Sequence, residues 1–200
     1  MAKIAVSLNE VVRDFLGQLV STHNKYLPPI DLVEGDVTDF NLVSHFNFTS
    51  VNQMNNFIFL EAPLEIFGHA DVLTDGLMNS FNNLIMDISD DEEHTIEITS
   101  REVDKSIPST FFYLSKTGCK IKNIRFVTQN IDEWGDADVL ITANPIALAN
   151  KPNGKISVKV NASYNTDVNA DFTIDSLLEF INDINFRNTV LNTKIISYEE

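Results

Sequence analysis

The stretch Lys3-Ile4-Ala5-Val6-Ser7-Leu8-Asn9-Glu10-Val11 decides the fold, because a short apolar run rich in β-forming residues leads directly into an amphipathic segment. The run as far as Leu8 predicts a buried strand. Beyond it, apolar residues recur four apart, which predicts a helix that begins at Glu10 and is stopped by Pro28-Pro29. Asn9 is expected to be the N-cap of that helix, with ligand binding as the alternative.

The second half of the chain alternates predicted strands with predicted helices. Strands are expected at Thr95–Thr99, Asn123–Thr128, Asp138–Thr142 and Lys155–Val160, and helices at Ser106–Lys116 and after an N-cap at Thr173. This alternation predicts an α/β fold: a mostly parallel sheet between two helical layers. Ligands of such sheets bind beyond the carboxyl ends of the strands. Those ends fall at Ser7–Asn9, Thr99–Arg101, Thr128–Asn130 and Thr142–Pro145.

Residues 31–94 differ from their surroundings, with loop-like stretches followed by a helical pattern over about 62–86 that the acidic run 87–93 ends. We expect them to form a small helical cap inserted into a core made of residues 1–30 and 95–190. The apolar run Phe57–Leu60 is either part of the cap core or an exposed contact patch.

Residues 191–200 are expected to be a C-terminal tail. Its end, Ile195–Glu200, includes β-forming residues, and such a segment could pair with an edge strand of another chain.

Charge and composition exclude several classes of function. The formal net charge is −15, and a surface this acidic repels phosphate backbones and anionic membranes, so no direct nucleic-acid or membrane partner is expected. The single cysteine, Cys119, excludes a framework of internal disulfides and is expected to be a thiol at the edge of the core. No secretion signal and no apolar run of about 18 residues is apparent, so the chain is expected not to be secreted.

Three motifs and their spacing resemble the haloacid dehalogenase-like superfamily, most closely its deoxyribonucleotidase branch, over roughly residues 3–165. Ile4–Val11 takes the place of the first motif, Ile98-Thr99-Ser100-Arg101 that of the second, and Asp138–Pro145 that of the last. The segment 31–94 takes the place of the family's cap. The resemblance implies a three-layer parallel sheet with a small helical cap.

The resemblance also places the family's catalytic carboxylates at positions that hold none here. The nucleophile falls at Ser7, the general acid/base at Asn9, and the Mg²⁺-binding pair at Thr142 and Ala143. An amide cannot exchange a proton near neutral pH, and Mg²⁺ requires hard anionic oxygens. We therefore expect no metal, no cofactor and no 5′-nucleotidase activity.

An anion site could survive without these carboxylates. Thr99, Ser100 and Arg101 retain hydroxyl groups, backbone amides and a cation at a strand end, and Lys116 could serve as the family's phosphate-contacting lysine. Ser7 as a nucleophile would need an adjacent base, and none of the four histidines follows a strand end suitably. Trp134 is expected to be a structural anchor before the last motif strand.

These observations predict a catalytically inactive, nucleotidase-like domain that acts through its surface as a structural or assembly protein. It is expected to join other protein subunits and to form a homo-oligomer within that complex. Nucleotidases of this branch are common in bacteriophage genomes, and the Asn- and Ile-rich composition fits an AT-rich phage. The specific prediction is a virion component such as a head–tail connector or ring protein, in the virion or the host cytoplasm. The alternatives are a non-catalytic nucleotide- or phosphate-binding module and a divergent phosphatase.

Overall fold

The computed structural model describes residues 2–90 and 93–196. Its strands are β1 Ala2–Ser7, β2 His94–Arg101, β3 Ile124–Val127, β4 Val139–Thr142, β5 Ile156–Val160 and β6 Phe172–Ile174. Its helices are α1 Phe15–Tyr26, α2 Leu42–His45, α3 Val51–Asn56, α4 Leu77–Asp90, α5 Ser106–Lys116, α6 Pro145–Ala149, α7 Leu177–Asn182 and α8 Ile184–Ile196. Short helical turns are η1 Glu34–Asp36, η2 Phe57–Glu61, η3 Leu64–Gly68 and η4 Asn130–Glu133.

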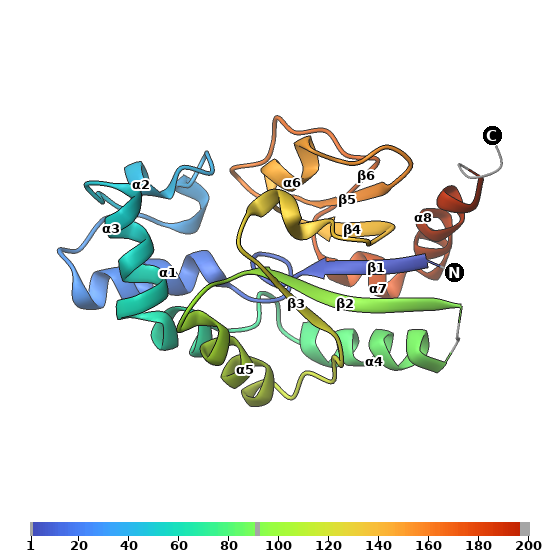
Figure 1. Cartoon of the computed structure of the whole chain (residues 1–200), viewed down its shortest axis with the longest axis horizontal. Coiled ribbons are helices and arrows are strands. Elements are labelled where there is room, and N and C mark those ends of the chain that lie inside the picture. Colours follow the sequence, from blue (N-terminus) through green and yellow to red (C-terminus); the bar gives the residue numbers. More distant parts are fainter. Residues whose placement is uncertain (1, 91–92, 197–200) are drawn as a thin grey trace.

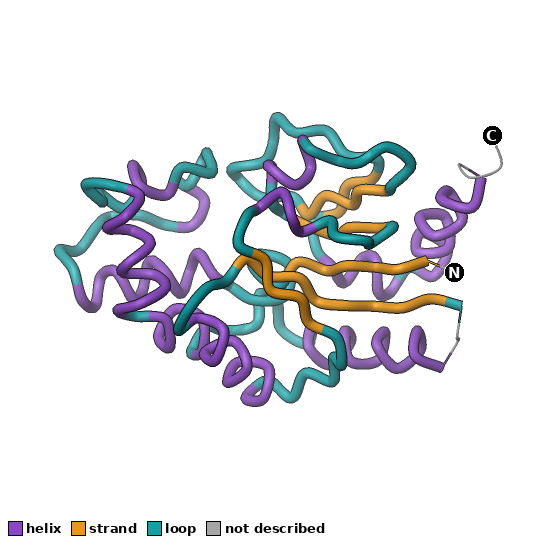
Figure 2. The backbone as a smooth tube through the Cα atoms, in the orientation of Figure 1, coloured by secondary structure: helices purple, strands orange, loops and turns teal. Residues whose placement is uncertain are grey.

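All six strands form one parallel sheet in the order β3-β2-β1-β4-β5-β6, which confirms the predicted α/β class (Figures 1 and 2). Side chains alternate between its two faces. Ile4 and Val6 of β1 join the large core cluster on the face that α4 and α7 cover. Ala5 joins a small cluster around Trp134 on the other face. The predicted anchor role of Trp134 is confirmed, since its indole N–H donates to the carbonyl of Ala147 at 2.8 Å.

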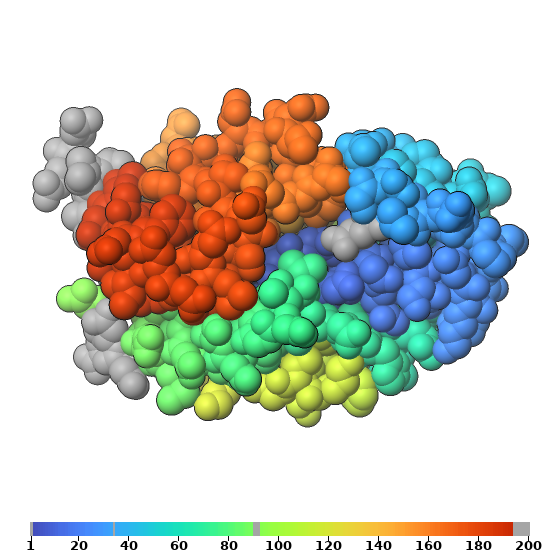
Figure 3. Space-filling model, turned by 180° about the vertical axis from the view of Figure 1, so that it is seen from behind, coloured from blue at the N-terminus to red at the C-terminus, as the bar shows by residue number. Residues whose placement is uncertain are grey.

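A second hydrophobic cluster holds the cap together beyond the carboxyl ends of the strands. It runs from α1 through η3 and is rich in phenylalanine. Figure 3 shows residues of about 15–60, in shades of blue, and the C-terminal helices, in red, at opposite ends of the molecule. Leu19 of α1 belongs to this cap cluster, whereas Phe81 of α4 belongs to the core cluster. Each cluster therefore contains residues from the expected core and from the expected insertion at 31–94. The domain limits expected from the sequence stay a prediction.

The first helix begins later than its apolar spacing predicts. Glu10 has a left-handed backbone (φ 60°), and residues 10–13 form a compact turn beneath the cap. The helix begins at Phe15, capped by Asp14, whose carboxylate accepts from the Gly17 amide at 2.8 Å. The expected N-cap role of Asn9 is therefore wrong. Val11 continues the apolar spacing but packs in the core from the turn, fully buried, and this mimics a helical pattern.

The C-terminal region also differs from expectation. Thr173 lies in β6, and Ser176 is the N-cap of α7 in a capping box with Glu179. Residues 184–196 form helix α8, so Ile195 and Ile196 are helical rather than strand-like. Leu191, the first residue of the expected tail, is buried in the core cluster. The remaining residues of the expected pairing segment, 197–200, lie outside the described residues.

Within residues 2–90 and 93–196, no helix combines the length and the apolar character that a bilayer crossing requires.

Candidate functional site

A cavity of about 290 Å³ lies between the carboxyl ends of the central strands and the cap. Its floor is polar and comes from the ends of β1, β2 and β4, where an open parallel sheet places its ligand crevice. Its walls are mainly apolar and come from α1, α3 and η2, with Phe15, Met54 and Phe59 among them. Six residues singled out from the sequence line it together: Ser7, Asn9, Thr99, Ser100, Arg101 and Thr142.

Two other predicted site residues lie elsewhere. Ala143 is buried in the core cluster, and its carbonyl accepts from the Asn165 side-chain amide at 2.9 Å. The Lys116 ammonium donates to the carbonyls of His69 and Ala70 at 3.2 and 3.0 Å, and it ties α5 to the segment after η3. The lysine does not line the cavity. Its ammonium group therefore has a structural role, since it donates hydrogen bonds to backbone carbonyls.

Glu133, which the sequence analysis did not single out, dominates the floor of the cavity. Its carboxyl group lies within hydrogen-bond distance of Ser7 Oγ at 2.6 Å and Thr142 Oγ1 at 3.0 Å, and it accepts from Asn144 Nδ2 at 2.8 Å. The residue is only 5% exposed, and this burial raises the pKa of the carboxyl group, although the three hydrogen bonds oppose the shift. Glu133 could have been found from its position in the segment that follows β3, because ligand-binding residues of parallel sheets occur after the strand ends.

Arg125 holds the turn that carries Glu133. Its guanidinium donates to the carbonyls of Asp132 and Glu133 at 2.7 and 2.8 Å, and it pairs with Glu97. Gly135 follows with φ +47°, and a Cβ at that position would lie 2.7 Å from the Arg125 guanidinium carbon. The turn therefore requires glycine for both its backbone angle and its close approach to Arg125.

Arg101 supplies a cation to the cavity. Burial lowers the pKa of its guanidinium, and the charge of Glu133 opposes the shift. Its Cζ lies 5.6 Å from the ring centroid of Phe59 in the cap, and its Nε donates to the Thr128 carbonyl at 3.3 Å. Among the described residues, no carboxylate lies within ion-pair distance of it. The guanidinium is therefore partly desolvated and held in place, yet its charge is not neutralised by a direct pair.

Thr99 contributes an unsatisfied hydroxyl group to the cavity wall. The residue is completely buried at the end of β2, beside Ser7 in the sheet register. Its hydroxyl oxygen has no hydrogen-bond partner within the described part of the chain. That oxygen has almost no accessible surface, so it is a buried polar atom and not a group that is open to a ligand.

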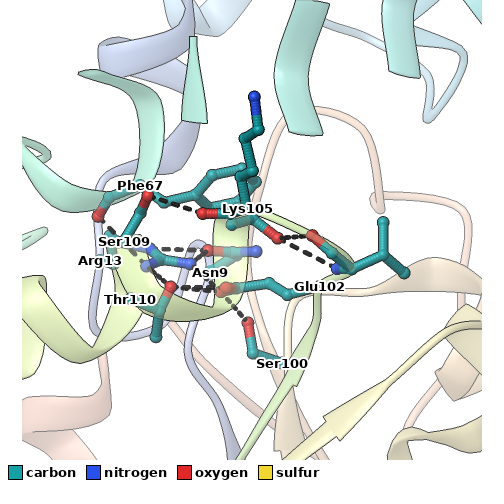
Figure 4. Close-up of polar contacts among 10 residues, drawn as sticks. Asn9, Arg13, Phe67, Ser100, Glu102, Lys105, Ser109 and Thr110 are labelled. Atoms are coloured by element: carbon teal, nitrogen blue, oxygen red, sulfur yellow. Dashed lines mark hydrogen bonds and ion pairs between the residues drawn. The ribbon is translucent and has the colours of Figure 1, made fainter. Parts of the chain in front are cut away.

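A fully buried ion pair supports the floor from below (Figure 4). Arg13 donates from Nη2 to Glu102 Oε1 at 2.6 Å, and neither side chain is exposed. Asn9 accepts from the same guanidinium at 2.6 Å, and Ser100 donates to Glu102 at 2.8 Å. Asn9 and Ser100 therefore use their side-chain oxygens to hold this network, while the amide nitrogen of Asn9 remains as a donor.

The residues on the floor do not fit Mg²⁺. Ser7, Asn9 and Thr142 are neutral, Ala143 offers no side-chain oxygen to the cavity, and Glu133 is held by three protein donors. Mg²⁺ requires carboxylate oxygens in octahedral geometry. Among the residues that the structure describes, no group of three acidic, histidine or cysteine side chains is placed to hold a metal ion.

No family model and no curated protein matches the sequence. Solved structures do resemble the fold. A dehalogenase crystallised with an intermediate complex superposes with a TM-score of 0.53 at 9% identity, covering 90% of this chain and 95% of that one. A haloacid dehalogenase-like family hydrolase from Xanthomonas campestris superposes with a TM-score of 0.51 at 8% identity, covering 100% and 99% of the two chains. The chain thus has the haloacid dehalogenase-like fold, as the sequence motifs predicted.

Proposed function

We propose that this protein is a non-catalytic binding module, which holds a small molecule with an anionic group and an apolar body and does not turn it over. Among the functions expected from the sequence, this alternative is the one that the cavity favours most. The anionic group binds at Arg101, and the apolar body lies against the cap. The observation that carries the proposal is the Arg101 cation, which lines the cavity and has no ion-pair partner within the described residues.

Catalytic inactivity is supported by what has replaced the family's carboxylates. Ser7 and Thr142 are hydroxyl residues that contact the side chain of Glu133. A serine hydroxyl that is engaged by a buried acid is not available to attack phosphorus, and no set of carboxylates remains to hold the Mg²⁺ that would neutralise a transferring phosphoryl group. The hydroxyls of Ser7 and Thr142 are therefore satisfied within the protein, whereas the Arg101 guanidinium has no ion-pair partner among the described residues.

The experiment combines a binding readout with a turnover readout. The full chain is titrated with benzoate, phenylacetate and phenyl phosphate while its melting temperature is followed, and hydrolysis of p-nitrophenyl phosphate is measured with Mg²⁺. At least one of the three anions should raise the melting temperature of the wild type, and hydrolysis should remain at background. Metal-dependent turnover that Ser7→Ala abolishes would instead establish a divergent phosphatase.

The matched control is a second arginine. Arg101→Met should lose the thermal shift, because the only unpaired cation lining the cavity within the described residues is removed. Arg187→Met should keep it, because Arg187 bonds the carbonyl of Ile181 away from the cavity. Equal shifts in both variants would remove Arg101 from the proposed site.

A structural role in a larger assembly is the second candidate. Phe111 and Phe112 on α5 are 51% and 44% exposed, and Leu64 of η3 is 47% exposed. Adjacent exposed apolar side chains of this kind occur at protein contacts. At a net charge of −15, isolated subunits repel one another, so a less acidic partner is expected. The finer proposal of a phage virion subunit rests on the sequence resemblance and composition. Co-purification with virions, lost on Phe111→Ser, would support it, and a free monomer in the native source would refute it.

A further inference from the structure

The contacts of Glu133 specify which kind of anion the cavity can take. Three oxygen atoms, Ser7 Oγ, Thr142 Oγ1 and Glu133 Oε2, lie within hydrogen-bond distance of one another. The three separations are 2.6, 2.7 and 3.0 Å. Each such contact needs one proton between its two oxygens. The two hydroxyl groups supply one proton each, so the third proton must come from the carboxyl group.

A neutral Glu133 satisfies every atom of this ring. The carboxylic acid donates to Ser7, Ser7 donates to Thr142, and Thr142 donates back to Glu133. The other oxygen of Glu133 accepts from Asn144 Nδ2 at 2.8 Å, and Thr142 Oγ1 also accepts from the Asn144 backbone amide at 3.0 Å. The burial that raises the pKa of Glu133 favours the same protonation state.

The charged groups near Glu133 are consistent with a neutral acid. Arg125 donates to the backbone carbonyl of Glu133 at 2.8 Å, but its charge is paired with Glu97. Arg101 lies in the same cavity without a direct ion pair. Glu10 also lines the cavity, and its carboxylate accepts from the Leu16 amide at 2.7 Å. Among the described residues that line the cavity, the one arginine or lysine is therefore Arg101.

We propose that Glu133 determines the ligand class of the cavity: it engages the donors at the ends of β1 and β4, and thereby restricts the site to a singly charged anion with an apolar body. This inference rests on the proposed binding function and deepens it. Within the described part of the cavity lining, the cation that remains is the Arg101 guanidinium, beside neutral amide groups such as that of Asn9. One cation matches one negative charge, whereas the second charge of a phosphate monoester would be buried without a partner.

The cavity size and walls agree with a compact ligand. A volume of about 290 Å³ is at the lower end of the range for small-molecule pockets, about 300–1,000 Å³. The ring of Phe59 already lies beneath the Arg101 guanidinium, and Phe67 stacks on Phe59 with 5.7 Å between ring centroids. An aromatic monocarboxylate such as phenylacetate therefore serves as the probe for the proposed class, and phenyl phosphate serves as its doubly charged counterpart.

The test is calorimetric titration of the full chain with each probe at neutral pH, where phenyl phosphate carries close to two charges. The wild type should bind phenylacetate at least about tenfold more tightly than phenyl phosphate. Failure to bind phenylacetate, or equal affinity for the two probes, would overturn the inference. Arg101→Met should lose both probes. If it binds both as the wild type does, the proposed function itself fails. If the wild type binds the two probes equally and Arg101→Met binds neither of them, only the inference about Glu133 fails.

Two substitutions at Glu133 separate the release of donors from the removal of a carboxyl group. Glu133→Gln keeps a polar side chain of the same shape. The hydroxyl groups of Ser7 and Thr142 can reorient to accept hydrogen bonds from its amide. Its affinity for both probes should stay close to that of the wild type. Glu133→Ala releases the Ser7, Thr142 and Asn144 donors to the cavity and should raise the affinity for phenyl phosphate by about tenfold or more.

An equal gain in affinity for phenyl phosphate in both variants would show that Glu133 acts through its charge. No gain in the folded alanine variant would show that Glu133 does not restrict the site. Either result contradicts the proposal. Circular dichroism establishes whether the alanine variant is folded. If it is not, the selectivity of the wild type and of Glu133→Gln decides the question.

Discussion

Arg13 and Glu102 form an ion pair of 2.6 Å in which neither side chain has any exposed surface. The pair connects three parts of the molecule: the turn after β1, the end of β2, and the cap, where Arg13 also donates to the Phe67 carbonyl at 3.3 Å. It explains why the chain turns tightly after Ser7 instead of entering a helix, because the guanidinium must reach all of these acceptors.

Breaking this pair should be strongly destabilising. Arg13→Met leaves Glu102 buried without its cation, and the free energy of unfolding should fall by about 3–5 kcal/mol. The measurement is urea denaturation followed by circular dichroism. Lys151→Met provides the control, because the Lys151–Asp171 pair is partly exposed and its loss should cost no more than about 1 kcal/mol. Similar losses in the two variants would mean that the buried pair does not hold cap and core together.

Gly135 should not tolerate even one additional carbon. Gly135→Ala combines a positive φ with a contact of 2.7 Å to Arg125, so a loss of at least about 1 kcal/mol in unfolding free energy is expected. Gly154→Ala has a similar φ of +74° but open space around the new carbon, and it should lose less. Thermal unfolding of both variants measures the difference. Equal losses would show that only the backbone angle matters.

His23 should be replaceable with a gain in stability. It is 3% exposed among Phe46, Phe48 and Phe57, and its Nδ1 has no hydrogen-bond partner within the described residues. His23→Leu removes this unsatisfied atom, which typically costs about 1–3 kcal/mol, at the expense of some ring contacts. A net increase in the urea midpoint is expected. A large decrease would show that the ring contacts outweigh the unsatisfied nitrogen.

Glu133 should make stability depend on pH in a defined direction. Its pKa is raised in the folded state, so the folded protein binds more protons than the unfolded chain between the ordinary carboxyl pKa and the raised one. Stability must therefore fall as pH rises through that window. In Glu133→Gln this contribution is absent, so the wild type should lose stability relative to the variant as pH rises. Urea denaturation at a series of pH values measures the difference.

Asp171 provides the opposite sign as a control. Burial raises the pKa of the Asp171 carboxyl group, but hydrogen bonds from Lys151 and Ser157 lower that pKa by more, so the net shift is downward. Its contribution to stability should be present at neutral pH and be lost as pH falls through the folded pKa. Relative to Asp171→Asn, the wild type should therefore lose stability on acidification. The same sign for both residues would contradict the assignment for Glu133.

Magnesium should leave the protein unchanged. A ligand stabilises the folded state only in proportion to RT ln(1 + [L]/Kd), and the neutral residues at the strand ends offer Mg²⁺ no suitable ligands. Millimolar Mg²⁺ is therefore expected not to raise the melting temperature. An increase of several degrees that EDTA reverses would show that a metal site exists and that the assignment of the floor residues is wrong.

The sequence was most informative where a pattern maps onto one element. The alternation of apolar segments predicted the parallel sheet, and Ser106–Lys116 was predicted with its observed limits, because these elements pack regularly against the core. The turn at residues 10–13 and the short strand β6 were missed, because apolar spacing cannot distinguish a buried turn from a helix. The prediction that Phe57–Leu60 includes cap core is confirmed for Phe57–Phe59, which are buried, while Leu60 is 40% exposed.

The candidate site was predicted only in part, for a related reason. Strand ends could be located, so six of the lining residues were found from the sequence. Glu133 belongs to a short helical turn and reaches Ser7 across 126 positions of the chain, a contact that no local pattern signals. Lys116 was misplaced because the distance from a strand end along a helix does not show which way a side chain points.

The decisive experiment is a crystal structure of the full chain with phenylacetate. We expect the carboxylate to lie within hydrogen-bond distance of the Arg101 guanidinium, with the ring against the cap and the Glu133 contacts to Ser7 and Thr142 intact. A carboxylate bound instead at the Ser7 and Thr142 hydroxyls, with Glu133 displaced, would contradict this expectation, as would a cavity that stays empty at saturating ligand.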